Sequence, residues 1–178
     1  MGSGRAPPSR SPGGTGRRAV GLFMGLARGA AAGAAGTTAL NTATYLDMLG
    51  RGRSPSSAPE ATVERLADLA GTSVPGDGDA ARNRTTALGA LQGLAVGVAV
   101  GAILGAARSV GWKPPLPVAA VLAATAAMVV ADGPMTLLGV TDPRRWSRVD
   151  WLSDAVPHLA YGLVTAATVG ATDHDRRV

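Results

Sequence analysis

Four residues near the C-terminal end of the chain could do acid–base chemistry together. Asp154 and His158 are four residues apart, Tyr161 follows three residues later, and Thr165 lies four residues beyond it. On a helix these spacings place all four side chains on one face. A carboxylate can orient an imidazole and favour its protonated form, and a tyrosine hydroxyl can extend the relay. The pattern predicts a site that handles protons or substrate. The alternative is structural: Asp154 stabilises a first helical turn, and His158 bonds to a neighbouring helix.

Another acid, Asp132, lies in the stretch "VVADGPMTLLG". Gly133 and Pro134 follow it directly, and we expect them to break or kink a helix and to free backbone carbonyls. A carboxylate at membrane depth is costly, so it marks a functional site by default, with an ion or a proton as ligand. The alternative is that the helix ends at Ala131, which leaves Asp132 at the membrane surface.

Asn41 completes the candidate polar set, because its amide could bond across to His158 or Asp132, chiefly as structural support. The candidate intramembrane polar site therefore comprises Asn41, Asp132, Asp154, His158 and Tyr161. We predict no metal, because zinc normally needs three or four protein ligands and the other histidine, His174, lies in a charged tail. No cofactor is predicted either.

Long uncharged stretches must position these residues. The 178-residue chain is 46% hydrophobic, but only 3% of its residues are aromatic. A spanning helix needs about 20 mostly apolar residues. Four stretches meet or approach that requirement, and the first is the least apolar because it contains Arg28, Asn41 and Asp47. We therefore predict an all-α membrane protein with one helical membrane domain over residues 19–172, whose spans cover about 20–48, 85–107, 117–140 and 152–172.

Glycine recurs at every fourth position of the second predicted span, at Gly89, Gly93, Gly97, Gly101 and Gly105. In lipid, helices associate through close backbone approach and dispersion contacts, which small residues permit. The stripe predicts glycine-mediated packing against another helix of the chain or, alternatively, against a second copy. The first predicted span carries a similar strip at Gly25, Gly29 and Gly33, which makes it the natural partner.

Between the first two spans, "SSAPEATVERLADLAG" predicts a short amphipathic helix over about 58–70. Ser57 and Glu60 have the spacing of a capping box, and Gly71 is a C-terminal stop. We expect its apolar stripe to pack on the bundle or on a partner, and a loop to follow; the stripe comprises Val63, Leu66, Ala67 and Ala70. Residues 1–18 are predicted to form a disordered basic tail, and residues 173–178 a charged tail.

Several function classes are excluded by what the sequence lacks. With no cysteine, the chain has no disulfide, thiolate nucleophile or cysteine-ligated metal. Because it has no hydrolase elbow, phosphate loop, dinucleotide fingerprint or paired catalytic carboxylates, we predict that it is not an enzyme. Its net charge of +5 is scattered over tails and loops without interleaved aromatics, which argues against a nucleic-acid partner.

The flanking arginines fit a membrane surface but leave the orientation nearly balanced. With four spans, eight Arg and Lys residues fall on each side, and Arg28 adds slightly to the side of the termini. Because the first segment often dominates orientation, we predict cytoplasmic termini for a multi-pass protein of the bacterial plasma (inner) membrane.

Two segments, "GTTALNTATYLDMLGRGRSPSSAPE" and "PHLAYGL", carry a resemblance. The chain resembles small uncharacterised multi-pass bacterial membrane proteins, in which a Gly-rich first helix precedes a Ser and Pro loop and an "HxxYG" segment opens a later helix. His158, Tyr161 and Gly162 are the matching positions. The resemblance implies a bacterial membrane protein and no particular activity.

The sequence thus favours an integral membrane protein with a structural or partner-binding role. Its partners are the lipid bilayer and either a second copy or another membrane protein. The alternative is a small proton-linked transporter or channel subunit that uses Asp132, Asp154 and His158.

Overall fold

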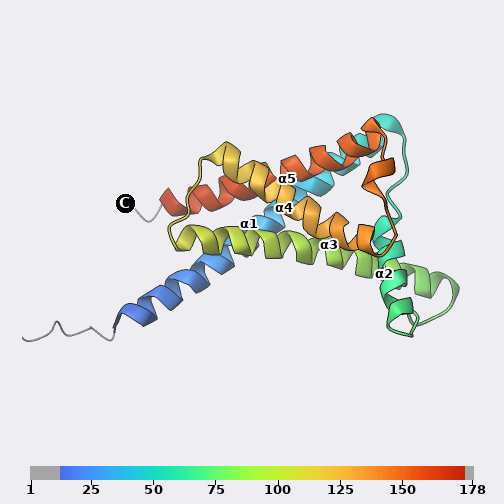
Figure 1. Ribbon diagram of the computed structural model, residues 1–178, viewed down its shortest axis with the longest axis horizontal. Helices are drawn as coiled ribbons and strands as arrows, with labels where there is room; N and C mark the ends of the chain where they lie inside the picture. The colour runs from blue at the N-terminus through green and yellow to red at the C-terminus, as the bar shows by residue number, and fades with distance from the viewer. Residues whose placement is uncertain (1–12, 175–178) are drawn as a thin grey trace, which may run out of the picture.

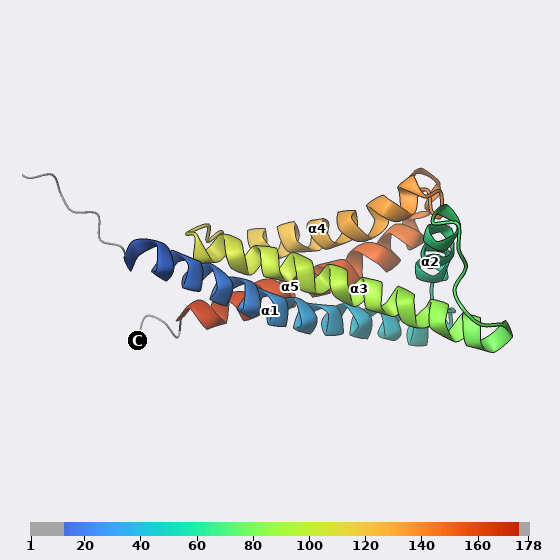
Figure 2. The same cartoon turned by 90° about the horizontal axis from the view of Figure 1, so that it is seen from below.

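The computed structural model describes residues 13–174, and all the regular structure in that range is helical (Figure 1). The helices are α1 (Gly13–Arg51), α2 (Ala58–Leu69), α3 (Gly78–Ser109), α4 (Leu116–Leu137) and α5 (Arg148–His174), and a short 3₁₀ turn, η1 (Pro143–Arg145), precedes α5. Consecutive long helices run in opposite directions, so α1 begins and α5 ends at the same end of the bundle (Figures 1 and 2). The short helix α2 lies at the opposite end.

Three of these helices are long and apolar enough to cross a membrane: Thr15–Arg51, Gly78–Ser109 and Leu116–Leu137. The sequence predicted four spans, and the fourth corresponds to α5. This helix is also long, but Asp150, Asp154 and His158 make its first half more polar than the other three. The all-helical prediction is confirmed for residues 13–174, and the three apolar helices fit a membrane protein.

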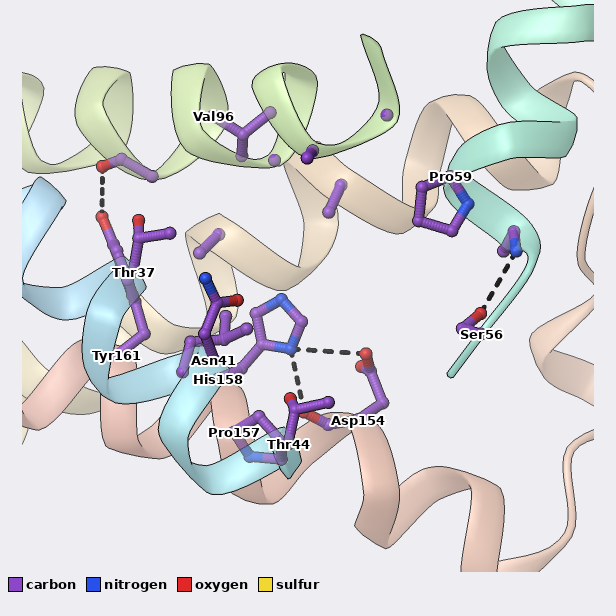
Figure 3. Close-up of a pocket in the computed structure, with 18 of the residues that line it drawn as sticks. Thr37, Asn41, Thr44, Ser56, Pro59, Val96, Asp154, Pro157, His158 and Tyr161 are labelled. Carbon is purple, nitrogen blue, oxygen red and sulfur yellow. Dashed lines mark hydrogen bonds and ion pairs between the residues drawn. The ribbon is translucent and has the colours of Figure 1, made fainter. Parts of the chain in front are cut away.

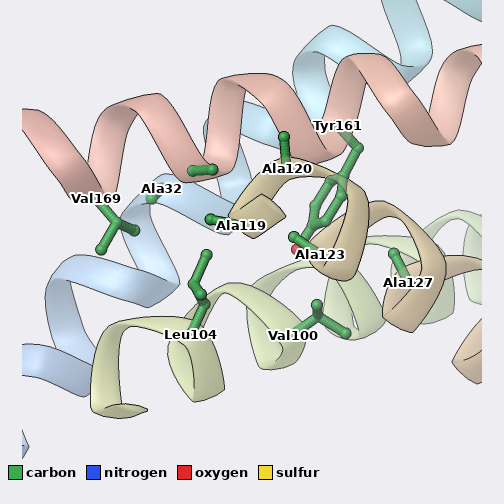
Figure 4. Close-up of a cluster of buried hydrophobic side chains, with 10 residues drawn as sticks. Ala32, Val100, Leu104, Ala119, Ala120, Ala123, Ala127, Tyr161 and Val169 are labelled. Atoms are coloured by element: carbon green, nitrogen blue, oxygen red, sulfur yellow. The ribbon is translucent and has the colours of Figure 1, made fainter. Parts of the chain in front are cut away.

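Small side chains fill the interior, and large apolar side chains point outward. The core cluster is mostly alanine and valine, and Tyr161 is the largest of the fully buried side chains described (Figure 4). Large apolar residues such as Phe23, Leu91 and Ile103 are 60–68% exposed. In water this arrangement would leave extensive apolar surface unburied, whereas in lipid it costs nothing. The distribution of side chains therefore agrees with a hydrocarbon surrounding.

Helices α1 and α3 make a close backbone contact through their glycines. A methyl group added at Gly29 would overlap the carbonyl oxygen of Gly101, and one added at Gly101 would lie 2.6 Å from the Cα of Gly33. Gly25 meets Gly105 in the same way, and Gly33 meets Gly97. At five of these six positions an added methyl group would overlap the backbone of the other helix, and at Gly97 it would overlap the hydroxyl of Thr37.

Two members of the glycine stripe face elsewhere. A methyl group at Gly89 would lie 2.9 Å from the Cβ of Pro59, so this glycine accommodates α2. Gly93 has no atom within 4 Å of an added methyl group, so its expected role in helix packing is wrong. The reason is geometric: a four-residue step drifts about 40° around the helix, and α1 crosses α3 at an angle, so the stripe and the partner helix separate.

Beyond this crossing, α1 leaves α3 and packs against α5 (Figure 1). Gly36 is the contact point, since a methyl group there would overlap the hydroxyl of Thr165 and lie 2.8 Å from the ring of Tyr161. Helix α4 packs mainly on α5, where Gly162 abuts the backbone of Ala120 and Ala124. Each close helix pair thus meets at small residues.

Several predicted boundaries change. Helix α1 begins at Gly13, inside the tail expected to be disordered, and α3 begins at Gly78, inside the expected loop. Residues 1–12 and 175–178 of the predicted tails lie outside the described residues. Helix α4 continues through Gly133 and Pro134 to Leu137, so these residues do not break the helix, and the alternative in which it ends at Ala131 is wrong. A proline removes one backbone N–H, and neighbouring helices can hold the segment together despite that loss.

Helix α2 confirms its predicted position but not its predicted cap or packing face. Gly71 ends the helix with φ +67°, as predicted. Ser57 makes no side-chain cap, because its φ of −92° and ψ of 0° lie outside the extended geometry that capping requires. The first turns pack on the bundle and bury Thr62, whereas Leu66 and Leu69 stay exposed.

The α1–α3 contact predicts opposite effects for one substitution at two glycines of α3. Gly101→Ala should destabilise the bundle by about 1–3 kcal/mol, because the methyl group would overlap backbone atoms of α1. Gly93→Ala should be neutral or stabilising by up to about 1 kcal/mol, since it gains helix propensity and meets open space. Thermal unfolding of the purified variants in detergent measures both effects. Equal shifts would show that the register of the stripe has no bearing on packing.

Candidate functional site

A cavity of about 890 Å³ opens in the half of the bundle that carries α2. Helices α1 and α3 diverge towards this end in Figure 1, and α3 and α4 diverge in Figure 2. The last part of α1, the start of α2, the first half of α3, the last part of α4 and the first half of α5 form its walls. All five candidate polar residues, Asn41, Asp132, Asp154, His158 and Tyr161, line this one cavity.

The best defined interaction in the cavity joins Asp154 to His158. The Nδ1 of His158 lies 2.8 Å from the backbone oxygen of Asp154 and 3.3 Å from its Oδ1 (Figure 3). A carbonyl oxygen can only accept, so Nδ1 carries the proton. In the neutral ring Nε2 is then an acceptor, and Figure 3 shows this nitrogen directed into the cavity. The predicted Asp–His pair is therefore present with a defined tautomer.

Asp132 approaches this pair from α4. Its carboxyl group interacts electrostatically with both Asp154 and His158. The Oδ2 atoms of Asp132 and Asp154 are buried and have no hydrogen-bond partner among the described residues. Buried carboxyl oxygens need donors, and leaving one unsatisfied costs about 1–3 kcal/mol. A proton, water or a ligand must supply the missing donors.

Tyr161 forms the floor of the cavity and does not extend the relay. Its hydroxyl donates to the backbone oxygen of Gly97 on α3 at 2.6 Å (Figure 3), and its side chain is fully buried. The Thr165 hydroxyl donates to the oxygen of Ala32 at 3.4 Å, one turn deeper in the bundle. The predicted continuation from His158 to Tyr161 and Thr165 is wrong, because both hydroxyls bond to carbonyls of other helices.

Asn41 lines the cavity but makes no hydrogen bond to His158 or Asp132, so the expected bond is absent from the part of the chain that the structure describes. Its helix, α1, forms the wall of the cavity across from α4. The amide is therefore available to a molecule in the cavity.

Sequence reasoning missed the charged residues near the mouth. Asp47 accepts from Arg51 and Arg53, each at 2.6 Å, and Arg51 also donates to Ser153 of α5 at 2.6 Å. Glu60, which the sequence assigned to a cap, has a buried Oε2 without a partner among the described residues. The loop between α1 and α2 brings Arg53 back to Asp47 and places α2 against α3. The sequence of this loop has no periodic pattern from which these contacts could be predicted.

Among residues 13–174, no group of three or more His, Asp or Glu side chains is close enough to hold a metal ion. No protein-family model matches the chain, and neither does any curated protein or solved structure.

The buried Tyr161 hydroxyl predicts a measurable contribution to stability. Tyr161→Phe removes the bond to Gly97 and should lower the free energy of unfolding by about 0.5–1.5 kcal/mol. Tyr45→Phe is the matched control, because Tyr45 is 63% exposed and should show no change. Chemical unfolding in mixed micelles compares the two variants. A Tyr161→Phe protein as stable as the control would contradict a stabilising hydrogen bond from Tyr161 to Gly97.

Proposed function

We propose that the protein is a multi-pass membrane protein of the bacterial plasma membrane in which α5 is a fourth span. Three observations support the fourth span. Leu152, Val156 and Leu163 on α5 are 52–62% exposed, as lipid-facing residues would be. Trp112 lies in the connection between α3 and α4, whereas Trp146 and Trp151 stack edge to face, 5.0 Å apart, at the other end of the bundle. Tryptophans at both ends are typical of the two membrane interfaces.

Four spans place the two termini on one side, and the proposed orientation places that side in the cytoplasm. Green fluorescent protein fused to either terminus should therefore fluoresce, because this reporter folds in the cytoplasm. Alkaline phosphatase fused after Gly76, between α2 and α3, should be active, because this enzyme needs the periplasm. Opposite behaviour of the two terminal fusions would show that α1 or α5 does not span.

Within this membrane protein, the cavity supports the function of a small proton-linked transporter or channel subunit better than a purely structural role. The single observation that carries this choice is the pair of buried, unpartnered carboxyl oxygens of Asp132 and Asp154 beside His158. A structural role needs paired polar groups, whereas transport needs a site that can gain and lose a ligand. Three of the five glycines that could have joined a second copy, Gly97, Gly101 and Gly105, are covered within the chain because they face α1.

The arrangement allows His158 to take up a proton from the cavity. Asp154 holds Nδ1 in its protonated form, so a proton arriving from the cavity binds at Nε2 and converts the ring to imidazolium. The two carboxylates of Asp132 and Asp154 can then compensate this charge. The other titratable or charged groups on the walls are Tyr45 and Arg51 of α1, Arg53 in the loop that follows, Glu60 of α2, and Asp150 and Tyr161 of α5. The lining residues of α3 carry no charge.

Proton movement through reconstituted protein tests this function. Vesicles that contain the unaltered chain and a pH-sensitive dye should acidify when a membrane potential, negative inside, is imposed. The double variant Asp132→Asn with His158→Gln should fall to the rate of protein-free vesicles, because it removes both the proton acceptor and one compensating charge.

Asp68→Asn is the matched control, because Asp68 is exposed on α2 and lies outside the cavity. Incorporation into vesicles and helical content should be the same for all three proteins. An unaltered chain that acidifies vesicles no faster than lipid alone would contradict the proposed function, and so would a double variant with full activity.

A further inference from the structure

Several hydrogen-bond donors on the cavity wall are consumed by the protein itself, although the amide of Asn41 is not among them. The hydroxyls of Thr37 and Thr38 donate to carbonyl oxygens four residues earlier, at 2.9 and 3.1 Å. The Ser153 hydroxyl donates to Val149 at 2.7 Å, and the indole N–H of Trp146 donates to Thr141 at 2.8 Å. The Tyr161 hydroxyl donates to Gly97. The hydroxyl groups can still accept hydrogen bonds, but all of these donors already donate their protons to acceptors of the protein.

The acceptors deep in the cavity show the opposite pattern. His158 is 9% exposed, its Nδ1 is occupied by Asp154, and its Nε2 faces the cavity with no partner among the described residues. The Oδ2 atoms of Asp132 and Asp154 are likewise buried and unpartnered within residues 13–174. The lining of the cavity thus includes acceptor atoms of three residues on two helices, without a protein donor among the described residues.

The charged groups of the cavity also favour a ligand that supplies donors and carries a positive charge. The deep part of the cavity holds two carboxylates, whereas the arginines Arg51 and Arg53 are bound to Asp47 near the mouth. An anion would meet two carboxylates and the lone pair of His158, whereas a cation would be attracted by all three groups. A metal ion is disfavoured because no group of three ligating side chains is close enough to coordinate one in the described part of the chain.

We infer that the deep cavity binds an organic cation that carries N–H donors, such as a guanidinium or a primary ammonium. The N–H groups of such a ligand supply the donors that Asp132, Asp154 and His158 lack. A volume of about 890 Å³ is far more than a proton needs and suits a small organic molecule. The ring of Tyr45 and the apolar side chains of Leu94 and Val96 on the wall suit the carbon part of that ligand.

This inference rests on the proposed function for the identity of the site and adds the chemical class of what enters it. A set of three related probes separates charge from N–H donors. Benzylguanidinium has a positive charge and N–H groups, benzyltrimethylammonium has the charge alone, and benzylurea has N–H groups without the charge. All three have the same aromatic ring.

Equilibrium binding to the purified full-length chain in nanodiscs of neutral phosphatidylcholine gives the first test. Radiolabelled benzylguanidinium should bind saturably, and the other two probes should compete at least about tenfold more weakly, since each loses charge-assisted hydrogen bonds. Benzyltrimethylammonium that competes equally well would overturn the inference, and so would the absence of saturable benzylguanidinium binding.

Variants locate the binding site within the chain. Asp154→Asn should weaken benzylguanidinium binding at least about tenfold, because it removes one of the charged acceptors. Asp68→Asn should bind like the unaltered chain. Unchanged binding by Asp154→Asn would overturn the inference, and if that variant does not fold, the three-probe comparison on the unaltered chain still decides.

Vesicle acidification in the presence of each probe separates this inference from the proposed function. Saturable benzylguanidinium binding without any proton movement supports the ligand class and contradicts transport. Proton movement without selective binding supports transport and overturns the ligand class.

Discussion

The backbone contact between α1 and α3 is the constraint on which the rest of this structure depends. In the proposed membrane setting, lipid provides no hydrophobic driving force for helix association, so the helices gain dispersion energy by approaching closely. At Gly29 and Gly101 the carbonyl of one helix occupies the space of the other's side chain. This contact fixes where the two helices cross, and a helix that crosses its neighbour at an angle must leave it on either side. The divergence that opens the cavity is therefore a consequence of the close contact.

Tyr161 lies where the closely packed half gives way to the cavity. It is a large side chain in a core made mostly of alanine and valine, and it reaches from α5 across to the backbone of α3. On the cavity side of it lie the polar residues Asp132, Asp154 and His158, and towards the other end of the bundle Val100, Leu104, Ala119 and Val169 belong to the apolar core (Figure 4). Gly97 belongs to both halves, because it faces Thr37 of α1 and its carbonyl accepts the Tyr161 hydroxyl. The polar and apolar halves of the bundle thus share one residue as their boundary.

Much of the fold could be predicted from the sequence, because apolar length and glycine spacing are local patterns. The long helices and the pairing of Gly25, Gly29 and Gly33 with the stripe on α3 follow from such patterns. The residues of the candidate site could also be predicted, since polar residues such as Asp132 and His158 stand out in apolar stretches of the sequence.

The hydrogen-bond partners of the site residues could not be predicted. Tyr161 bonds to a backbone carbonyl, which no side-chain pattern reveals, and Glu60 reaches the cavity only because the loop after α1 folds α2 against α3. The predicted packing role of Gly93 is wrong for a related reason, since a regular glycine stripe does not specify over what length of α3 the partner helix stays in contact.

The division of the bundle also explains how a small protein tolerates unpaired carboxyl groups. Each buried, unsatisfied oxygen at Asp132, Asp154 and Glu60 costs free energy, and interhelical hydrogen bonds in membranes contribute only about 0.6–2 kcal/mol each. The polar half of the bundle therefore cannot be its own source of stability. The glycine contacts between α1 and α3, and those of Gly36 and Gly162 with α5 and α4, lie mostly outside the cavity and do not depend on its charge state. Because stability comes from one half and polar chemistry is confined to the other, the protonation or occupancy of the cavity can change without loss of the packing that holds the helices together.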